Sequence, residues 1–264
     1  MTKTLITEVQ DNIATVTLNR PTKKNAMSFD MMRDLVETAK TLATTDGLRA
    51  VILTGADHCF CAGIDLESLM AIVPKIDEIR ESILNPPQGE AANEFQAPAT
   101  IWSSLNVPVI AALEGVAFGA GAQLALGADF RIAAPDTGFS IMEAKWGLIP
   151  DMGISQSLPK LVRADIAMEL IMTGRILDAA EAQNIGLITR LSDDPLAEAM
   201  TLAETLSTKS PDALNAAKKL VNGTWGCGEA GLKLEAELQA AIIGQPNQME
   251  MVMAVMGKRE PKFK

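Results

Sequence analysis

The segment VPVIAALEGVAFGAGAQLAL, residues 107–126, carries the clearest structural pattern in the chain. It opens with a continuous apolar run through Leu113, typical of a strand that is buried on both faces. Three glycines follow, at 115, 119 and 121, and the composition then favours a helix through Leu126. Phe130 to Ala133 predicts another strand. A strand, a glycine turn, a helix and a strand form a βαβ unit, which predicts an α/β fold with a largely parallel sheet.

An earlier segment repeats this design. A buried strand from Val51 to Leu53 leads through Thr54-Gly55 to the small-residue turn Cys61-Ala-Gly-Ile-Asp-Leu66. Each segment therefore runs from a strand through small residues to the start of a helix, where backbone N–H groups lack helical partners and the helix dipole is positive. Two such helix starts facing one cleft would offer two amides to a single oxygen atom, which is an oxyanion hole.

The other elements follow from local signals. A hairpin is expected from Leu5–Val9 and Ile13–Leu18 around the turn Asp11-Asn12, and a helix from Ser28 to Asp46. Residues 74–98 are polar and weakly periodic, and we expect a mobile insertion or lid there. The last third predicts six helices, at Ala164–Met172, Asp178–Asn184, Pro195–Thr208, Ser210–Asn222, Leu232–Ile243 and Gln248–Met256. The methionines of the last helix favour either core packing or subunit contact equally.

Composition excludes several classes of function. The 264 residues carry a net charge of −10 with a pI near 4.7, which argues against nucleic acid and anionic membranes as partners. The chain has no Tyr and a single His, His58, so multi-histidine metal sites are excluded. The motif His58-Cys59-x-Cys61 lacks a fourth zinc ligand, and no metal is expected. Three cysteines and an N-terminus without a signal pattern favour a reduced, cytoplasmic location.

Other interpretations of the glycine-rich segment compete. The pattern Gly115-x-x-x-Gly119-x-Gly121 is also found in short-chain dehydrogenases, but the catalytic Tyr of that family is absent here. A membrane span is disfavoured, because Pro108, Glu114 and the glycines interrupt the apolar run well short of about 20 residues. Close packing of a helix against the sheet is a structural alternative that remains open.

Taken together, several segments in this order resemble the crotonase superfamily, the enoyl-CoA hydratase/isomerase family. The resemblance covers nearly the whole chain. The matching segments are Val16–Pro21 with Asn25-Ala26, Phe60–Leu66, Pro108–Asp129, Trp146–Pro150, Leu170–Gly174, Ala179–Leu187 and Lys258–Phe263.

The resemblance implies a spiral of ββα units over residues 1–190 and a helical region over residues 191–264 that forms trimers or dimers of trimers. It also implies acyl-CoA substrates, with coenzyme A as part of the substrate and no permanently bound cofactor. By position, the amides of Ile64 and Ala120 would form the oxyanion hole. The positions matching the family's CoA site are Lys23, Lys24, Ala62, Asp65 and Leu66. For the two lysines, a solvated loop is the alternative.

The acid and base residues decide the reaction. Hydratases of this family use two Glu residues; here Glu143 matches one of them, and Gln123 replaces the other. Because Gln cannot exchange a proton near neutral pH, and Asp151 adds a second acid, double-bond isomerisation is preferred. Hydration of 2-enoyl-CoA and acyl-CoA binding without catalysis are the alternatives. Asp151 could instead cap a helix near Gly153, Glu143 could be an exposed helix-start acid, and Gln123 could simply line a pocket.

Overall fold

The computed structural model describes residues 3–71, 73–225, 246–247, 250, 253–254 and 257–264. The strands are β1 Leu5–Gln10, β2 Ile13–Leu18, β3 Ala50–Gly55, β4 Val109–Leu113, β5 Val116–Phe118, β6 Phe130–Ala133, β7 Gly138–Ser140 and β8 Arg190–Leu191. The α-helices are α1 Phe29–Ala43, α2 Leu66–Ala71, α3 Ile76–Leu84, α4 Ala97–Thr100, α5 Ala120–Leu126, α6 Ile154–Ser157, α7 Ala164–Thr173, α8 Ala179–Asn184, α9 Pro195–Ser207 and α10 Pro211–Thr224. Short 3₁₀ helices include η3 Ile101–Ser104 and η4 Glu143–Trp146.

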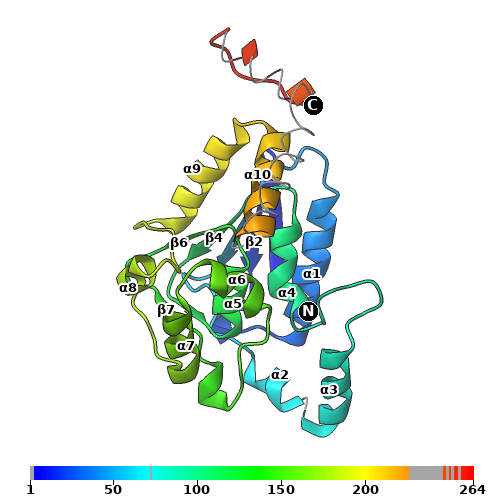
Figure 1. Cartoon of the computed structure of the whole chain (residues 1–264), viewed down its shortest axis with the longest axis vertical. Helices are drawn as coiled ribbons and strands as arrows, with labels where there is room; N and C mark the ends of the chain where they lie inside the picture. Colours follow the sequence, from blue (N-terminus) through cyan, green and yellow to red (C-terminus); the bar gives the residue numbers. More distant parts are fainter. Residues whose placement is uncertain (1–2, 72, 226–245, 248–249, 251–252, 255–256) are drawn as a thin grey trace.

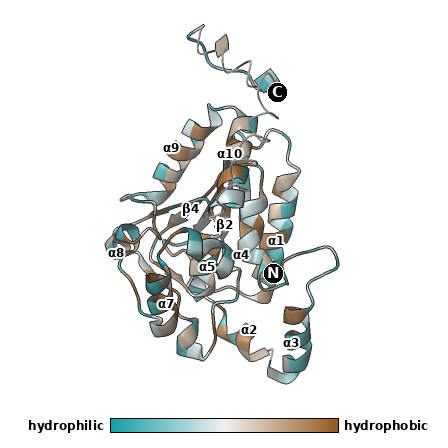
Figure 2. Cartoon of the chain, viewed as in Figure 1, coloured by the Kyte–Doolittle hydropathy of each residue, from teal (hydrophilic) through white to brown (hydrophobic). Residues whose placement is uncertain are grey.

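A six-stranded sheet in the order β1-β2-β3-β4-β6-β8 forms the centre of the molecule. Only the β1–β2 hairpin is antiparallel, and the other neighbours pair in parallel. One face packs against α9, where Ile52, Ile110 and Ile132 meet Ala199 and Ala203. The opposite face belongs to the main core, together with α1 and α5. Burial on both faces explains why the central strands are apolar without alternation. Figure 2 shows β2 and β4 between α9 and α1, helices that carry both hydrophilic and hydrophobic residues.

A second, smaller sheet makes the fold a spiral. Strands β5 and β7 pair in parallel, with Ala117 opposite Phe139, and Cys61 forms a further parallel bridge to Ala117. Each repeat thus contributes a strand to the large sheet, a short strand to the small sheet, and then a helix. The three repeats in sequence are β3 with Cys61 and α2, β4 with β5 and α5, and β6 with β7 and η4. The predicted α/β fold with ββα repeats is confirmed (Figure 1).

Most of the local predictions agree with the structure. Asp11 and Asn12 adopt positive φ angles of 50° and 64° at the hairpin turn, as Asp and Asn tolerate. Ser28 caps α1 by accepting a hydrogen bond from the Met31 amide. The helices expected near residues 164–172, 178–184, 195–208 and 210–222 are present as α7, α8, α9 and α10. The helices expected at Leu232–Ile243 and Gln248–Met256 lie almost entirely outside the described residues.

Two features of the structure were not predicted from the sequence. Residues 74–98, expected to be a mobile insertion or lid, contain a helix, α3, at Ile76–Leu84, and their mobility stays a prediction. Its first turn carries Asp77 and Glu78, which favour a helix start, but no side chain caps it, so the local signal for a helix is weak. The strands β5 and β7 were also missed, because three residues are too few for an alternating pattern to show. Among the described residues, none of the helices is both long and apolar enough for a membrane span.

Candidate active site

Three turns meet at the carboxyl end of the small sheet. Cys61, Ala117 and Phe139 are neighbours across it, and adjacent strands in a sheet lie about 4.8 Å apart. The chain leaves these strands in the same direction, so Ile64, Ala120 and Glu143 follow at similar distances along three successive repeats. The amide of Phe118 donates to the Cys61 carbonyl at 3.0 Å, and that of Gly119 to the Ser140 carbonyl at 2.9 Å. The sequence-predicted turns are therefore adjacent.

Glycines allow the two helix starts to come close. A Cβ on Gly121 would lie 2.5 Å from the Cys61 carbonyl oxygen, and one on Gly63 would lie 3.1 Å from that of Phe118. Among the described residues, the structure gives no hydrogen-bond acceptor to the amides of Ile64 or Ala120. Ala120 is the first residue of α5, where helix geometry leaves the N–H without a partner. Two unpaired amides on adjacent turns can serve one oxygen atom, and their role as an oxyanion hole stays a prediction.

Glu143 lies beside Gly119, the residue before Ala120, and is held by Gln123. The Gln123 Nε2 donates to Glu143 Oε1 at 2.7 Å, while the Gln123 Oε1 accepts from the Met152 amide at 2.8 Å. A Cβ on Gly119 would lie 3.3 Å from Glu143 Oε1, which places the carboxyl over the start of α5. The other oxygen, Oε2, is buried and has no hydrogen-bond partner. Glu143 is therefore half-buried and not an exposed acid at a helix start.

Both carboxyl groups have raised pKa values. Burial is the main cause of the raised pKa of Glu143 and the negative charge of Asp151 adds to the rise, against hydrogen bonds from its own backbone amide and from Gln123. Burial also raises the pKa of Asp151, because protein atoms crowd its carboxyl even though the residue as a whole is exposed. Asp151 is not a helix cap: the N-cap of α6 is Gly153, without a side-chain hydrogen bond. Both acids are thus biased toward holding a proton, which suits proton transfer.

The residues predicted to bind coenzyme A also lie together. The Ala62 amide donates to the Lys24 carbonyl at 3.0 Å, which joins the lysine loop to the turn before α2. Lys23 is exposed and pairs with Glu67 of α2 at 2.8 Å, and Lys24 is exposed next to it. Leu66 is more than half exposed at the start of α2. Lys23, Lys24 and Leu66 are exposed on one surface, whereas Asp65 is buried beneath it. Binding of a ligand by this group stays a prediction.

Asp65 has a structural task that the sequence did not show. Its carboxylate pairs with Arg20 at 2.5 Å and accepts from the Glu67 amide at 2.8 Å, so it caps α2. These bonds hold the pKa of Asp65 below its usual range despite the burial that opposes them. Buried Asn25 adds a second anchor, because its Nδ2 donates to the carbonyls of Ala56 and Cys59. In the sequence, these roles of Asp65 and Asn25 are indicated only by a polar residue type next to a tight turn.

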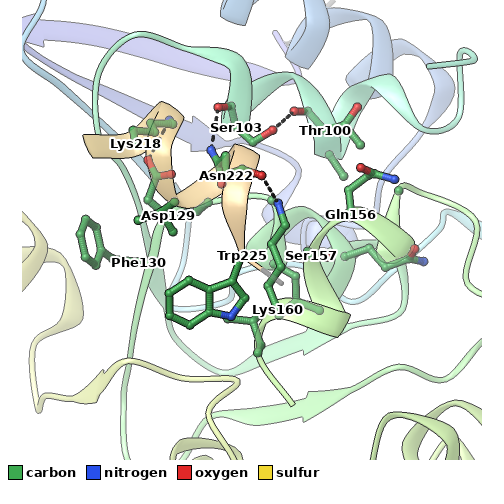
Figure 3. A pocket seen from close by; sticks show the side chains of 18 of the residues that line it. Thr100, Ser103, Asp129, Phe130, Gln156, Ser157, Lys160, Lys218, Asn222 and Trp225 are labelled. Atoms are coloured by element: carbon green, nitrogen blue, oxygen red, sulfur yellow. Dashed lines mark hydrogen bonds and ion pairs between the residues drawn. The ribbon is translucent and has the colours of Figure 1, made fainter. Parts of the chain in front are cut away.

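A cavity of about 870 Å³ adjoins Gln123 and Met152, and its lining residues include neither Glu143 nor Asp151. It lies between α4, the end of α5 and α10, and Gln123 and Met152 are part of its wall. Figure 3 shows a buried ion pair in this wall, with Lys218 Nζ 2.8 Å from Asp129, and Lys160 donating to the Asn222 carbonyl. Lys218 also donates to the carbonyls of Trp102 and Val107, which ties α10 to the β4 repeat. Gln123 therefore contacts both this cavity and Glu143.

Comparison with known proteins gives one consistent result. The family model described as "Enoyl-CoA hydratase/isomerase" matches residues 8–264. The 1,2-epoxyphenylacetyl-CoA isomerase of Escherichia coli is 34% identical over 100% of this chain and 99% of its own. The peroxisomal Δ(3,5)-Δ(2,4)-dienoyl-CoA isomerase of Arabidopsis thaliana is 32% identical over 93% of this chain and 90% of its own. The crystal structure of an enoyl-CoA hydratase from Bacillus anthracis superposes with a TM-score of 0.89 at 29% identity, covering 99% of both chains.

Proposed function

The chain belongs to the enoyl-CoA hydratase/isomerase family, and we propose that within it the protein shifts a double bond in an enoyl- or dienoyl-CoA thioester. The observation that carries this proposal is the hydrogen bonding of Gln123, which donates to Glu143 and accepts from the amide of Met152, the residue after Asp151. A Gln side chain exchanges no proton near neutral pH, so proton transfer falls to the two acids. Isomerisation needs a proton removed from one carbon and one returned to another, and two carboxyl groups suffice.

In the proposed reaction, the thioester carbonyl oxygen accepts hydrogen bonds from the amides of Ile64 and Ala120. Glu143, as carboxylate, removes a proton from the carbon next to the carbonyl, and the electrons of that C–H bond form an enolate on the oxygen. Protonated Asp151, or Glu143 itself, then gives a proton to the far carbon of the conjugated system, and the double bond moves. Each amide donor is typically worth ~10²–10³ in rate, and the acid and base groups add ~10²–10⁴.

Coenzyme A recognition is proposed for the surface formed by Lys23, Lys24, Ala62 and the Asp65-Leu66 turn. Lys23 and Lys24 supply local positive charge on a protein whose net charge is −10. Because binding to the folded state alone stabilises it by linkage, acyl-CoA thioesters are expected to raise the melting temperature. Reversal of charge at Lys24, by Lys24→Glu, is expected to reduce that shift more than Lys209→Glu on a distant exposed turn.

Hydration of 2-enoyl-CoA is the second candidate, because other relatives are named enoyl-CoA hydratases. The test is to follow hydration of crotonyl-CoA and isomerisation of 3-enoyl- and 3,5-dienoyl-CoA with the same enzyme. The wild type is expected to isomerise, and Gln123→Glu is expected to gain hydration, because a second acid then faces the substrate. Strong hydration by the wild type without isomerisation would refute the proposal. Turnover that is unchanged in Glu143→Gln and Asp151→Asn would refute the assignment of the acid and base. Binding of these thioesters without any turnover by the wild type would favour an acyl-CoA-binding protein without catalysis.

A further inference from the structure

Both ends of the Gln123 side chain are engaged. Its Nε2 donates to Glu143 and its Oε1 accepts from the Met152 amide, at 2.7 and 2.8 Å. The residue is only 2% exposed, so water does not compete strongly for either end. The Met152 N–H can only donate, and it therefore fixes the carbonyl end of Gln123 and leaves the NH₂ end for Glu143. One buried amide thus joins α5 to two separate parts of the segment between β7 and α6.

This bridge makes the two oxygens of Glu143 unequal. Oε1 accepts the Gln123 hydrogen bond, whereas Oε2 is buried and without any partner. A buried acceptor without a partner costs about 1–3 kcal/mol, so it calls for an explanation. In a reacting site the explanation is that Oε2 is the atom that takes the proton, while Oε1 anchors the carboxyl.

The same bridge also constrains Asp151. Met152 is the next residue, and its amide is held by Gln123, so the backbone that carries Asp151 is tied to the group that holds Glu143. A single side chain therefore contacts one acid directly and holds the backbone next to the other.

We propose that Gln123 is a positioning residue. It leaves Oε2 of Glu143 free for proton transfer, and it holds the backbone next to Asp151 in place. This deepens the proposed function and rests on it for the identity of the transferred proton. It gives the Gln a task that a second Glu cannot perform. A Glu at position 123 would face Glu143 within hydrogen-bond distance, and one of the two carboxyls would have to carry a proton.

The test compares Gln123→Met, Gln123→Glu and a control, Gln183→Met, on the exposed side of α8. Met has a similar volume to Gln and removes both hydrogen bonds. In Gln123→Met we expect kcat for isomerisation to fall about 10- to 100-fold, with KM for the acyl-CoA changed less than threefold. The acid limb of the kcat profile should move to higher pH in both Gln123 variants, since the hydrogen bond that favours the charged Glu143 is lost. The control should leave all three quantities unchanged.

A second readout does not depend on turnover. Difference infrared spectra against Glu143→Gln report the titration of the Glu143 carboxyl, and it should move to higher pH in Gln123→Met. If both the infrared titration and the acid limb stay at wild-type values in Gln123→Met, the positioning role is refuted. If the infrared titration moves but the wild type shows no isomerisation, the bridge stands and the proposed reaction fails.

Discussion

The backbone amide of Ala120 cannot be mutated, but it can be displaced through Gly121. A Cβ at this position would lie 2.5 Å from the Cys61 carbonyl oxygen and 3.0 Å from the Cys61 Sγ. An ordinary contact starts at about 3.4 Å, so the start of α5 must retreat by about 0.9 Å to accept Gly121→Ala. Because an oxyanion donor acts at about 2.7–3.1 Å, this retreat would largely remove one of the two donors.

We therefore expect Gly121→Ala to lower kcat for acyl-CoA turnover by ~10²–10³. Overpacking should also cost ~1–3 kcal/mol of folding free energy, measured by urea unfolding. The matched control is Gly127→Ala at the other end of α5, where a Cβ would lie 2.0 Å from the Ala99 carbonyl oxygen. The control should lose similar stability, while the folded fraction keeps kcat within a few-fold.

The measurement is steady-state turnover at a temperature where circular dichroism shows both variants folded. A folded Gly121→Ala protein with wild-type kcat would refute the assignment of the Ala120 amide. Equal losses of kcat in the two variants would show that general strain in α5, and not the position of one donor, limits the reaction.

Three further predictions concern charge. Burial raises the pKa of Glu143 in the folded protein, so ionisation of this carboxyl destabilises the fold as the pH rises from the pKa of the unfolded chain through that of the folded protein. Glu143→Gln should therefore raise Tm at pH 8 and have no effect below pH 4. Arg20→Met leaves Asp65 without its cation and should cost ~3 kcal/mol in urea unfolding, whereas Arg20→Lys should recover part of it. Lys218→Met strands buried Asp129 and should cost ~3–5 kcal/mol, with acyl-CoA affinity of the folded protein unchanged.

Much of the fold can be predicted from interactions between residues that are close in the sequence. The apolar run at Val109–Leu113 is buried throughout, and the cap at Ser28 and the turn at Asp11-Asn12 act as their residue types predict. These features depend on side chains a few residues apart, which the sequence lists in order. The short strands β5 and β7 gave no such signal, because their pairing joins residues from different repeats.

The candidate site likewise has features that the sequence predicts and contacts that only the structure reveals. The sequence alone identified the two small-residue turns, Glu143, and the replacement of a family Glu by Gln123, because each is a matter of residue type at a position. Only the tertiary structure decided that Gln123 bridges Glu143 to the Met152 amide, and that Asp65 forms an ion pair with Arg20. Hydrogen bonds join atoms within about 3 Å across long sequence separations, and packing determines which atoms come that close.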